Sequence, residues 1–395
     1  MHKIYFDNGS TALPKAPGVA DAMKNYVDTA GFNVGRGGYQ AGIDVAMQVL
    51  ETREALAAFF AAPSARNVVF SSGLTTAMNV LLQGFLAEGD HVITTSMEHN
   101  SVMRPLHALV ESRGVQLDIA ACDKHGQLDC AAIEALMRPH TRLVVMLHAS
   151  NVCGTVLPVA QVGALCRERG IRFIVDAAQT AGVLPLDLGA MNIDALAFAG
   201  HKALLGPQGI GGFVISDDFA AEVSPLIFGG TGSQTQSFEQ PQNLPDKFES
   251  GTQNIPGILG LKAAIEYLNA RGIDSIYQHE MKLYEHFVAQ VSDIEGLDHI
   301  APRSSDKVAV ASVNFPERDN AHIAHRLDRE YGIMARCGLH CAPAAHKTLG
   351  TYPAGTLRFS FGHANTVEEV DHLLDALRQL IETTPLETEG SSHGI

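Results

Sequence analysis

Two segments of the chain carry side chains that could perform amine chemistry together. Lys202 lies in a small-residue run that follows the apolar stretch 195–198, and Asp176 ends another apolar stretch at 172–175. A lysine amine can condense with an aldehyde, and a carboxylate can keep a pyridine nitrogen protonated so that the ring accepts electrons. Each residue alone has an ordinary explanation, as a solvated lysine or as an aspartate that ends a strand. Together, in this order, they predict a site for pyridoxal 5'-phosphate.

A strand, a turn and a helix are expected across residues 70–79, and this pattern could bind an anion. Gly73 lies in the turn and allows close approach of the backbone, while Thr75 or Thr76 can add a hydroxyl. The first N–H groups of a helix are unpaired, and the helix dipole favours a negative charge there. The segment therefore predicts a cup for the cofactor phosphate, although an ordinary capped helix explains the same pattern.

Three polar side chains follow or lie within other predicted strands. His99 follows the stretch 91–95 and could stack on a pyridine ring, whereas Asn151 follows the stretch 143–147 and could donate to a ring oxygen or to a substrate carboxylate. Arg358 has apolar neighbours, and a guanidinium there can hold a carboxylate through two hydrogen bonds. A loop histidine, a turn asparagine and a structural ion pair remain the alternatives.

A loop at 335–346 contains Cys337 and Cys341, and a cysteine on this loop, near Arg336, His340 and His346, could be a thiolate at neutral pH. An unperturbed thiol has a pKa of about 8.5, which nearby cations lower. The alternatives are a buried small hydrophobe and a zinc site formed with Cys337. Since the spacing of these residues is not a standard zinc pairing, we predict no metal.

Composition narrows the class of protein. The chain has 395 residues, 46% of them hydrophobic and 18% charged, which predicts a globular enzyme of two domains. A formal charge of −15 argues against nucleic acid and anionic membranes as partners. The first residues do not resemble a secretion or transit signal, no stretch is long and apolar enough to span a membrane, and the six cysteines are scattered. These features favour a cytoplasmic location.

Apolar runs alternate with helical patterns over the first two thirds of the chain. Several runs are continuously apolar, which is typical of strands covered on both faces. This rhythm predicts an α/β fold whose central sheet is mostly parallel and carries helices on both faces. The expected strands are 67–70, 91–95, 143–147, 172–175, 195–198 and 212–215, and the expected helices include 75–86 and 159–169.

The pattern changes after residue 257, where shorter strands and helices predict a smaller α+β domain. Its last helix is the clearest in the chain, because Thr366 and Glu369 form a capping box before a run of leucines at helical spacing. The predicted boundaries are 12–256 for a large cofactor-binding domain, 1–11 with 257–383 for a small domain that carries the Cys341 loop, and 384–395 for a disordered tail. Other elements expected in the small domain are 258–270, 308–315, 322–331, 333–336 and 356–361.

Taken together, these motifs resemble the class V aminotransferase superfamily of fold-type I pyridoxal phosphate enzymes, and within it the cysteine desulfurase and selenocysteine lyase family. The short interval between Cys341 and Arg358 resembles the branch typified by the SUF-system desulfurases. The resemblance extends over nearly the whole chain and rests on residues 5–8, 73–79, 98–100, 150–155, 176–179, 200–202 and 248–252, together with Arg358.

The resemblance implies a role for each candidate side chain. Lys202 forms the Schiff base and moves protons. Cys341 accepts sulfur, and we expect a protonated His340 or His346 to lower the pKa of its thiol. The other implied roles are a pyridine-nitrogen partner (Asp176), a partner of the phenolic oxygen (Gln179), a ring-stacking residue (His99), phosphate ligands (Leu74, Thr75 and His201, with Thr252 from the second subunit of a homodimer) and substrate-carboxylate ligands (Asn151 and Arg358).

The implied activity is conversion of L-cysteine to L-alanine, with sulfur left as a persulfide on Cys341 for an acceptor thiol or protein, as in iron–sulfur cluster biogenesis. The alternatives are a selenocysteine lyase, a class V aminotransferase or β-lyase, and a non-catalytic sulfur carrier or zinc-binding scaffold. Two residues depart from the usual pattern. Ala199 replaces a hydroxyl residue, and Thr76 replaces a common glutamate, so both bear on cofactor affinity.

Overall fold

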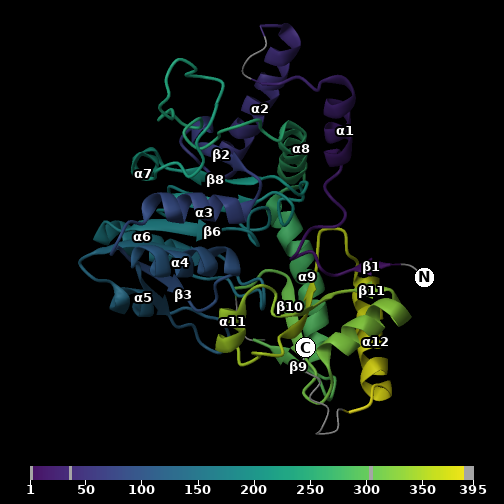
Figure 1. Ribbon diagram of the computed structural model, residues 1–395. Helices are drawn as coiled ribbons and strands as arrows, with labels where there is room; N and C mark the ends of the chain where they lie inside the picture. Colours follow the sequence, from purple (N-terminus) through teal and green to yellow (C-terminus); the bar gives the residue numbers. More distant parts are fainter. Residues whose placement is uncertain (1–2, 35–37, 302–305, 387–395) are drawn as a thin grey trace.

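A seven-stranded sheet forms the centre of the larger part of the molecule (Figure 1). The computed structural model describes residues 3–34, 38–301 and 306–386. All strand pairs of this sheet are parallel except those of β8, which runs antiparallel to β2 and β7. In spatial order the strands are β2 (Val68–Ser71), β8 (Gly211–Ile215), β7 (Ala195–Ala199), β6 (Arg172–Asp176), β5 (Thr141–Leu147), β3 (His91–Thr95) and β4 (Gln116–Ala120). The predicted α/β fold with a mostly parallel sheet is confirmed.

Helices cover both faces of this sheet, and alternate strand residues pack against each layer. In β5, Val144 and Met146 belong to one core cluster, whereas Leu143 and Val145 belong to the other. This arrangement explains why the strand is continuously apolar. One layer contains α3 (Leu74–Phe85), α4 (Asn100–Arg113) and α7 (Asp217–Glu222), and the other contains α2 (Gln40–Phe59), α5 (Cys130–Leu136), α6 (Val159–Arg169) and α8 (Ile255–Arg271), against which α1 (Val19–Thr29) packs.

The edge strand β4 was not expected from the sequence. Gln116 and Ile119 are exposed and Leu117 and Asp118 are half-buried, so the segment lacks the continuous apolar run of the inner strands. An edge strand has a neighbour on one side only, and the requirement for apolar residues is correspondingly weaker. The pattern that identified the central strands therefore could not identify this one.

A second, antiparallel sheet forms the core of the C-terminal part, in the order β12 (Arg336–Gly338), β13 (Thr356–Ser360), β10 (Val310–Asn314) and β9 (Asp298–Ile300). The short strand β1 (Ile4–Tyr5) pairs in parallel with β11 (Ile333–Met334), and Figure 1 shows these two strands side by side. Ile4 and Phe6 enter the same core cluster, so the start of the chain packs with the C-terminal part. The remaining elements are η1 (Ala65–Asn67), α9 (Ile273–Val291), α10 (Asn320–Arg326), η2 (Leu327–Tyr331), α11 (Pro343–Thr348) and α12 (Val367–Thr383).

The segment expected to be a disordered tail begins at Thr384, which is buried. Its carbonyl accepts a hydrogen bond from Arg318, and its hydroxyl accepts one from Arg326. Residues 387–395 lie outside the described residues. Among the helices that the structure describes, none is long and apolar enough to cross a membrane.

A buried ion pair fixes the strand that leads to the predicted phosphate turn. Glu249 accepts two hydrogen bonds from the Arg53 guanidinium, at 2.8 and 2.5 Å, and a third from the backbone N–H of Phe70 at 2.6 Å. Arg53 lies on α2 and Phe70 lies on β2, whereas Glu249 precedes the predicted phosphate ligand Thr252. One carboxylate thus connects α2 to two segments that the sequence predicts to border the cofactor, 70–79 and 248–252.

We predict that Glu249→Ala lowers the free energy of unfolding by about 3–5 kcal/mol, because it leaves the Arg53 guanidinium buried without a counter-charge. Urea unfolding followed by circular dichroism measures the change. Asp28→Ala is the matched control, since it removes a carboxylate from an exposed pair with Lys24 and is expected to change stability by less than about 0.5 kcal/mol. Equal effects of the two substitutions would contradict the role given to Glu249.

Candidate active site

A cavity of about 300 Å³ lies where the carboxyl ends of the central strands meet the start of α3. Ligands of open α/β sheets bind in such a crevice because the carboxyl ends of parallel strands converge there. The structure brings most of the predicted site residues into its wall: Leu74, Thr75, His99, Asn151, Asp176, Gln179, His201 and Lys202. Ala199 and Thr76, the two departures from the family pattern, also line it.

Lys202 and Asp176 face the same buried space. Burial lowers the pKa of the Lys202 amine and raises the pKa of the Asp176 carboxyl, and the attraction between the two groups opposes both shifts. Asp176 accepts a hydrogen bond from the backbone N–H of Ala178 at 2.9 Å and one from the Ser101 hydroxyl at 3.3 Å. These bonds orient the carboxylate toward the cavity.

His99 is held in a defined neutral form at the start of α4. Its Nδ1 accepts the backbone N–H of Ser101 at 3.0 Å, so Nε2 carries the ring hydrogen. Burial is the main cause that lowers the pKa of His99 to about 3, and the positive charge of Lys202 adds to it. A neutral ring in this position can lie against an electron-poor aromatic ring without charge repulsion.

The start of α3 has the features of an anion site. Gly73 precedes the helix with φ of 153°, and the hydroxyls of Ser72 and Thr76 are 2.8 Å apart. Across the cavity, His201 Nδ1 is buried without a hydrogen-bond partner in the described structure. An unpaired helix start and an unpaired ring nitrogen together fit a phosphate group. With Lys202 for an aldehyde, the residues present fit pyridoxal 5'-phosphate.

Gln179 lines the cavity and also anchors the N-terminal segment, since its side-chain amide donates to the carbonyl of Gly9 at 3.0 Å. This contact extends the site to the first ten residues of the chain. Nothing in the sequence pattern indicates that positions 9 and 179 meet.

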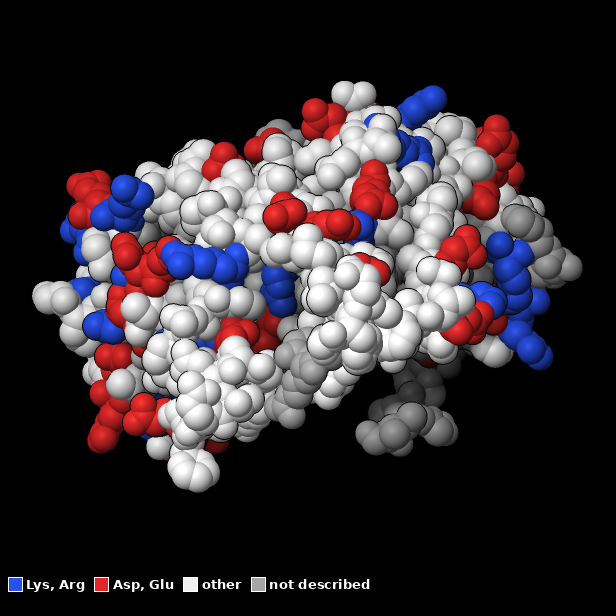
Figure 2. Space-filling view, turned by 90° about the horizontal axis from the view of Figure 1, so that it is seen from above, with Lys and Arg blue, Asp and Glu red and all other residues white. Residues whose placement is uncertain are grey.

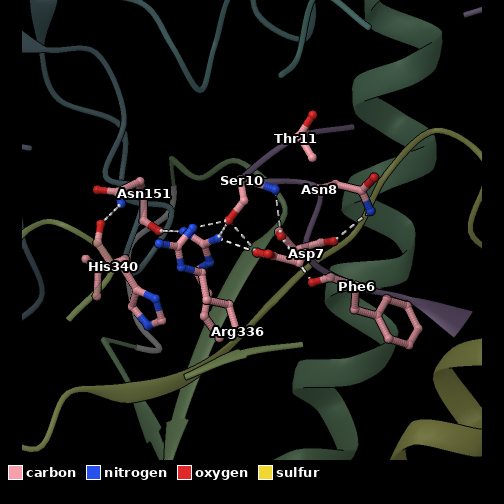
Figure 3. Close-up of polar contacts among 12 residues, drawn as sticks. Phe6, Asp7, Asn8, Ser10, Thr11, Asn151, Arg336 and His340 are labelled. Atoms are coloured by element: carbon pink, nitrogen blue, oxygen red, sulfur yellow. Dashed lines mark hydrogen bonds and ion pairs between the residues drawn. The ribbon is translucent and has the colours of Figure 1, made fainter. Parts of the chain in front are cut away.

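Arg358 is fully buried next to the cavity and is already bonded on two sides. One Nη donates to the carbonyl of Asn151 at 2.9 Å, while the other donates to Asp7 at 2.6 Å and to the Ser10 hydroxyl at 2.8 Å. Figure 3 shows Asp7, Ser10 and Asn151 converging on this region. The structural ion pair that the sequence left open as an alternative is therefore present in the structure.

The loop between β12 and α11 places Cys341 beside the cavity with an exposed thiol. Its carbonyl accepts the backbone N–H of Asn100 at 2.8 Å, and the carbonyl of His340 accepts the Asn151 amide at 2.8 Å. His340 and Cys341 both have left-handed backbone conformations, with φ of 48° and 56°. Such conformations are unfavourable for residues with a side chain and persist only where surrounding contacts hold them.

The prediction that a protonated His340 or His346 lowers the pKa of Cys341 is wrong. Both imidazoles are buried, and burial lowers the pKa of His340 to about 2 and that of His346 to about 4. Both rings are therefore neutral near pH 7 and carry no positive charge to stabilise a thiolate. The loop pattern showed that these residues are near Cys341, but not that the fold buries them.

Cys337 belongs to the core and not to the site. It lies on β12 and packs against the C-terminal core cluster, and burial raises its pKa to about 11. Among residues 3–34, 38–301 and 306–386, no group of three or more His, Cys, Asp or Glu side chains could hold a metal ion. The zinc alternative thus has no ligand set in that part of the chain.

Thr252 is not near Lys202 within one chain. It lines a separate cavity together with Arg66 and residues 230–233. The structure of a single chain therefore does not bring this predicted phosphate ligand to the Lys202 cavity.

Several contacts that shape the site could not be predicted from the sequence. Asp7 and Ser10 bond Arg358, Ser101 bonds Asp176, and Arg336 donates to Ser10 at 2.7 Å. Asp7 lies in a segment that carries the family resemblance, which was the only signal available. The partners are separated by up to 351 residues, so spacing along the chain could not pair them.

Glu98 is a buried carboxyl group beneath the site. Its Oε1 accepts hydrogen bonds from the Thr95 hydroxyl at 2.6 Å and from the backbone N–H of Leu147 at 3.1 Å. Burial raises its pKa to about 8, and the negative charge of Asp176 contributes in the same direction. Near pH 7 this carboxyl is protonated, so it adds no negative charge near Asp176.

Comparisons with known proteins show the family to which this chain belongs. The model of the family "Aminotransferase class-V" matches residues 4–373. The chain is 36% identical to a probable cysteine desulfurase of Methanothermobacter thermautotrophicus, covering 95% of this chain and 94% of that protein, and 35% identical to one of Pyrococcus abyssi, covering 96% and 94%. The apo structure of a cysteine desulfurase from Thermococcus onnurineus is 32% identical, covers 96% of this chain and 95% of that one, and superposes with a TM-score of 0.90.

We predict that Glu98→Gln flattens the dependence of unfolding free energy on pH. Between the unfolded pKa near 4.5 and the folded pKa near 8, only the folded state keeps this proton, so stability falls as pH rises. The substitution should remove a slope of up to about 1.4 kcal/mol per pH unit. Urea unfolding at intervals from pH 6.5 to 7.5 tests this, and parallel curves for the two proteins would refute it.

Proposed function

The chain belongs to the aminotransferase class-V family, and from this premise we propose that it is a pyridoxal 5'-phosphate-dependent cysteine desulfurase. It converts L-cysteine to L-alanine and leaves the sulfur as a persulfide on Cys341. The observation that carries the proposal is a cavity lined by both Lys202 and Asp176, with the exposed Cys341 tethered at its edge. An aminotransferase also needs a lysine and an aspartate in its cofactor cavity, but its reaction does not use an exposed cysteine at the edge of that cavity.

The cofactor would be held by groups on four sides of the cavity. The start of α3, with Leu74 and Thr75, and the unpaired His201 Nδ1 suit its phosphate. The remaining assignments are Asp176 for the pyridine nitrogen, Gln179 for the phenolic oxygen, His99 for the ring face and Lys202 for the aldehyde carbon. When bound, the cofactor supplies an electron-accepting ring next to the substrate Cα.

Lys202 performs the proton transfers. Burial lowers the pKa of its amine, so more of it is unprotonated near neutral pH than in a solvated lysine, and an unprotonated amine can take the Cα proton. Asp176 is the counter-charge for a protonated pyridine nitrogen, since a nearby cation favours the ionised carboxylate against the effect of burial. Asn151 in the cavity wall and Arg358, which donates to the Asn151 carbonyl, would hold the substrate carboxylate.

Cys341 accepts the sulfur. Its thiolate attacks the substrate sulfur, so an S–S bond forms as the Cβ–S bond breaks, and alanine leaves after protonation. One cysteine and one protein thiol yield one alanine and one protein persulfide, so no external oxidant or reductant is required. Because the thiol is exposed, an acceptor thiol or protein can reach the persulfide. A free thiol of this kind requires a reducing compartment, for which we propose the cytosol.

We further propose a homodimer in which Thr252 serves the cavity of the partner. Large apolar side chains are exposed on and around α1 and α2, and others lie between residues 226 and 238, on the side of the Thr252 cavity. Figure 2 views the molecule from above, where α2 lies in Figure 1, and shows broad areas without charge between the acidic and basic groups. The exposed apolar residues are Val27, Phe32, Tyr39, Ile43, Met47, Leu50, Leu226, Ile227, Phe228 and Phe238.

We predict that Cys341→Ser lowers alanine formation from L-cysteine by on the order of 10³-fold or more, because the substitution removes the nucleophile. The yellow colour of the bound cofactor should persist. Cys337→Ser is the control, expected to retain activity because Cys337 lies outside the cavity. Mass spectrometry after L-cysteine treatment should find one added sulfur on Cys341. Undiminished alanine formation by Cys341→Ser would defeat the proposal, and a keto acid product would favour an aminotransferase.

We predict a solution mass of twice 42.2 kDa by light scattering. Phe228→Glu should yield monomers, because it places charge in an apolar patch, and it should weaken cofactor binding by about tenfold as the partner's hydrogen bond is lost. Thr252→Val should weaken cofactor binding similarly while leaving the dimer intact. A wild-type monomer that binds the cofactor tightly would rule out the shared site.

A further inference from the structure

The carbonyl oxygen of His201 is held by three donors from the start of the chain. It accepts hydrogen bonds from the backbone N–H of Ala12 at 2.9 Å, from the Thr11 hydroxyl at 3.1 Å and from the Lys15 amine at 3.0 Å. His201 lines the Lys202 cavity, and its ring nitrogen Nδ1 has no hydrogen-bond partner in the described structure. The Lys15 amine is therefore in direct contact with a residue of the cavity wall.

Lys15 is a positive charge without a negative partner. Its other hydrogen bond is to the Thr11 hydroxyl at 2.8 Å, so both of its acceptors are neutral. Among the residues that the structure describes, no carboxylate pairs with its amine. The residue is half-buried, and burial lowers its pKa to about 8. A half-buried cation without a counter-ion is stabilised by an anion that binds nearby.

The titratable groups around Lys15 do not supply that anion. Tyr5 donates its hydroxyl hydrogen to two backbone carbonyls of the same segment, and burial is the main cause that raises its pKa to about 12. Asp7 is paired with Arg358. The ring of His201 is neutral near pH 7, because burial lowers its pKa to about 4, with a further contribution from nearby lysine charges.

The phosphate site of the cavity is short of positive charge. A phosphate monoester has a second pKa near 6, so it carries close to two negative charges at pH 7. The start of α3 contributes the equivalent of about half a positive charge. Of the described residues that line the cavity, Lys202 is the only lysine or arginine, and it is assigned to the cofactor aldehyde. A further cation is needed to balance the phosphate.

We propose that Lys15 is the charge partner of the cofactor phosphate, and that it acts across His201, whose peptide carbonyl it holds. The carbonyl and the ring of one histidine are only a few bonds apart, so the amine and the unpaired Nδ1 lie on two sides of one residue. Lys15 is then a positioning and electrostatic residue and makes no contact with reacting atoms. The inference deepens the proposed function and rests on it only in requiring a cofactor that carries a phosphate group.

The test compares pyridoxal 5'-phosphate with pyridoxal, which lacks the phosphate group. Binding of each to the full-length protein freed of cofactor is followed by the absorption of the ring. We expect Lys15→Met to weaken binding of pyridoxal 5'-phosphate by about 10- to 30-fold, as for a lost charge–charge interaction at an effective dielectric constant near 20. Pyridoxal binding should stay within twofold, because Ala12 and Thr11 still hold the His201 carbonyl. Lys15→Arg keeps the charge and should restore most of the affinity.

The wild type should also show a pH dependence that Lys15→Met lacks. A bound phosphate dianion favours the charged amine, so the pKa of Lys15 in the complex lies above its value of about 8 in the free protein. Binding near pH 8 then takes up about half a proton, and the preference for pyridoxal 5'-phosphate over pyridoxal decreases as pH rises from 7 to 9. Calorimetry in two buffers of different ionisation enthalpy measures the uptake. A preference that is constant over this range in the wild type would contradict the inference, even if Lys15→Met does not fold.

Lys24→Met is the matched control. Lys24 is an exposed lysine on α1, and its hydrogen bond is to Asp28. We expect this variant to bind both ligands as the wild type does, which separates the contact at His201 from a general loss of positive charge. An equal loss of affinity for the two ligands in Lys15→Met, or an unchanged preference for the phosphate-bearing one, would overturn the inference.

The proposed function is tested separately. If the wild type binds pyridoxal 5'-phosphate but forms no alanine from L-cysteine, the desulfurase proposal fails, while the comparison of the two ligands still reports on Lys15. If alanine forms but Lys15→Met keeps the full preference for the phosphate-bearing ligand, the proposed function stands and the role of Lys15 does not.

Discussion

The buried ion pair between Asp7 and Arg358 is the contact on which the geometry of the site depends. Arg358 lies on a strand of the C-terminal sheet, Asp7 follows the first strand of the chain, and the same guanidinium bonds the Asn151 carbonyl at the end of the central sheet. Asn151 then bonds His340, next to Cys341. A guanidinium removed from water requires a counter-charge. The pairing of Arg358 with Asp7 therefore holds the three segments together. The position of the Cys341 thiol relative to Lys202 follows from that requirement.

Burial decides which side chains around the cavity carry charge. It lowers the pKa of His99, His201 and His340 to values well below 7, so these rings are neutral hydrogen-bonding and stacking groups. Arginine keeps its proton under the same conditions. The positive charge beside the cavity therefore does not come from these histidines, and those near Cys341 act through shape and hydrogen bonds.

The sequence predicted the central sheet well, because strands such as 143–147 are buried on both faces. Burial on both faces requires a continuous run of apolar residues, which is visible in the sequence. The edge strand β4 was missed because one side of it is open to solvent. Among site residues, Lys202 and Asp176 could be recognised from their places at the ends of strands. The roles of Asp7, Ser10 and Arg336 could not, since they arise from contacts between distant segments.

By itself the sequence determined the layered α/β architecture, the cofactor-type pairing of Lys202 with Asp176, and the presence of a cysteine on a loop. These depend on local patterns, namely strand periodicity and small residues in turns. Only the tertiary structure decided the protonation of His340 and His346, the pairing of Arg358 with Asp7, and the contact of Arg336 with Ser10. Protonation and pairing depend on which atoms surround a group after folding, and the order of residues along the chain does not specify those neighbours.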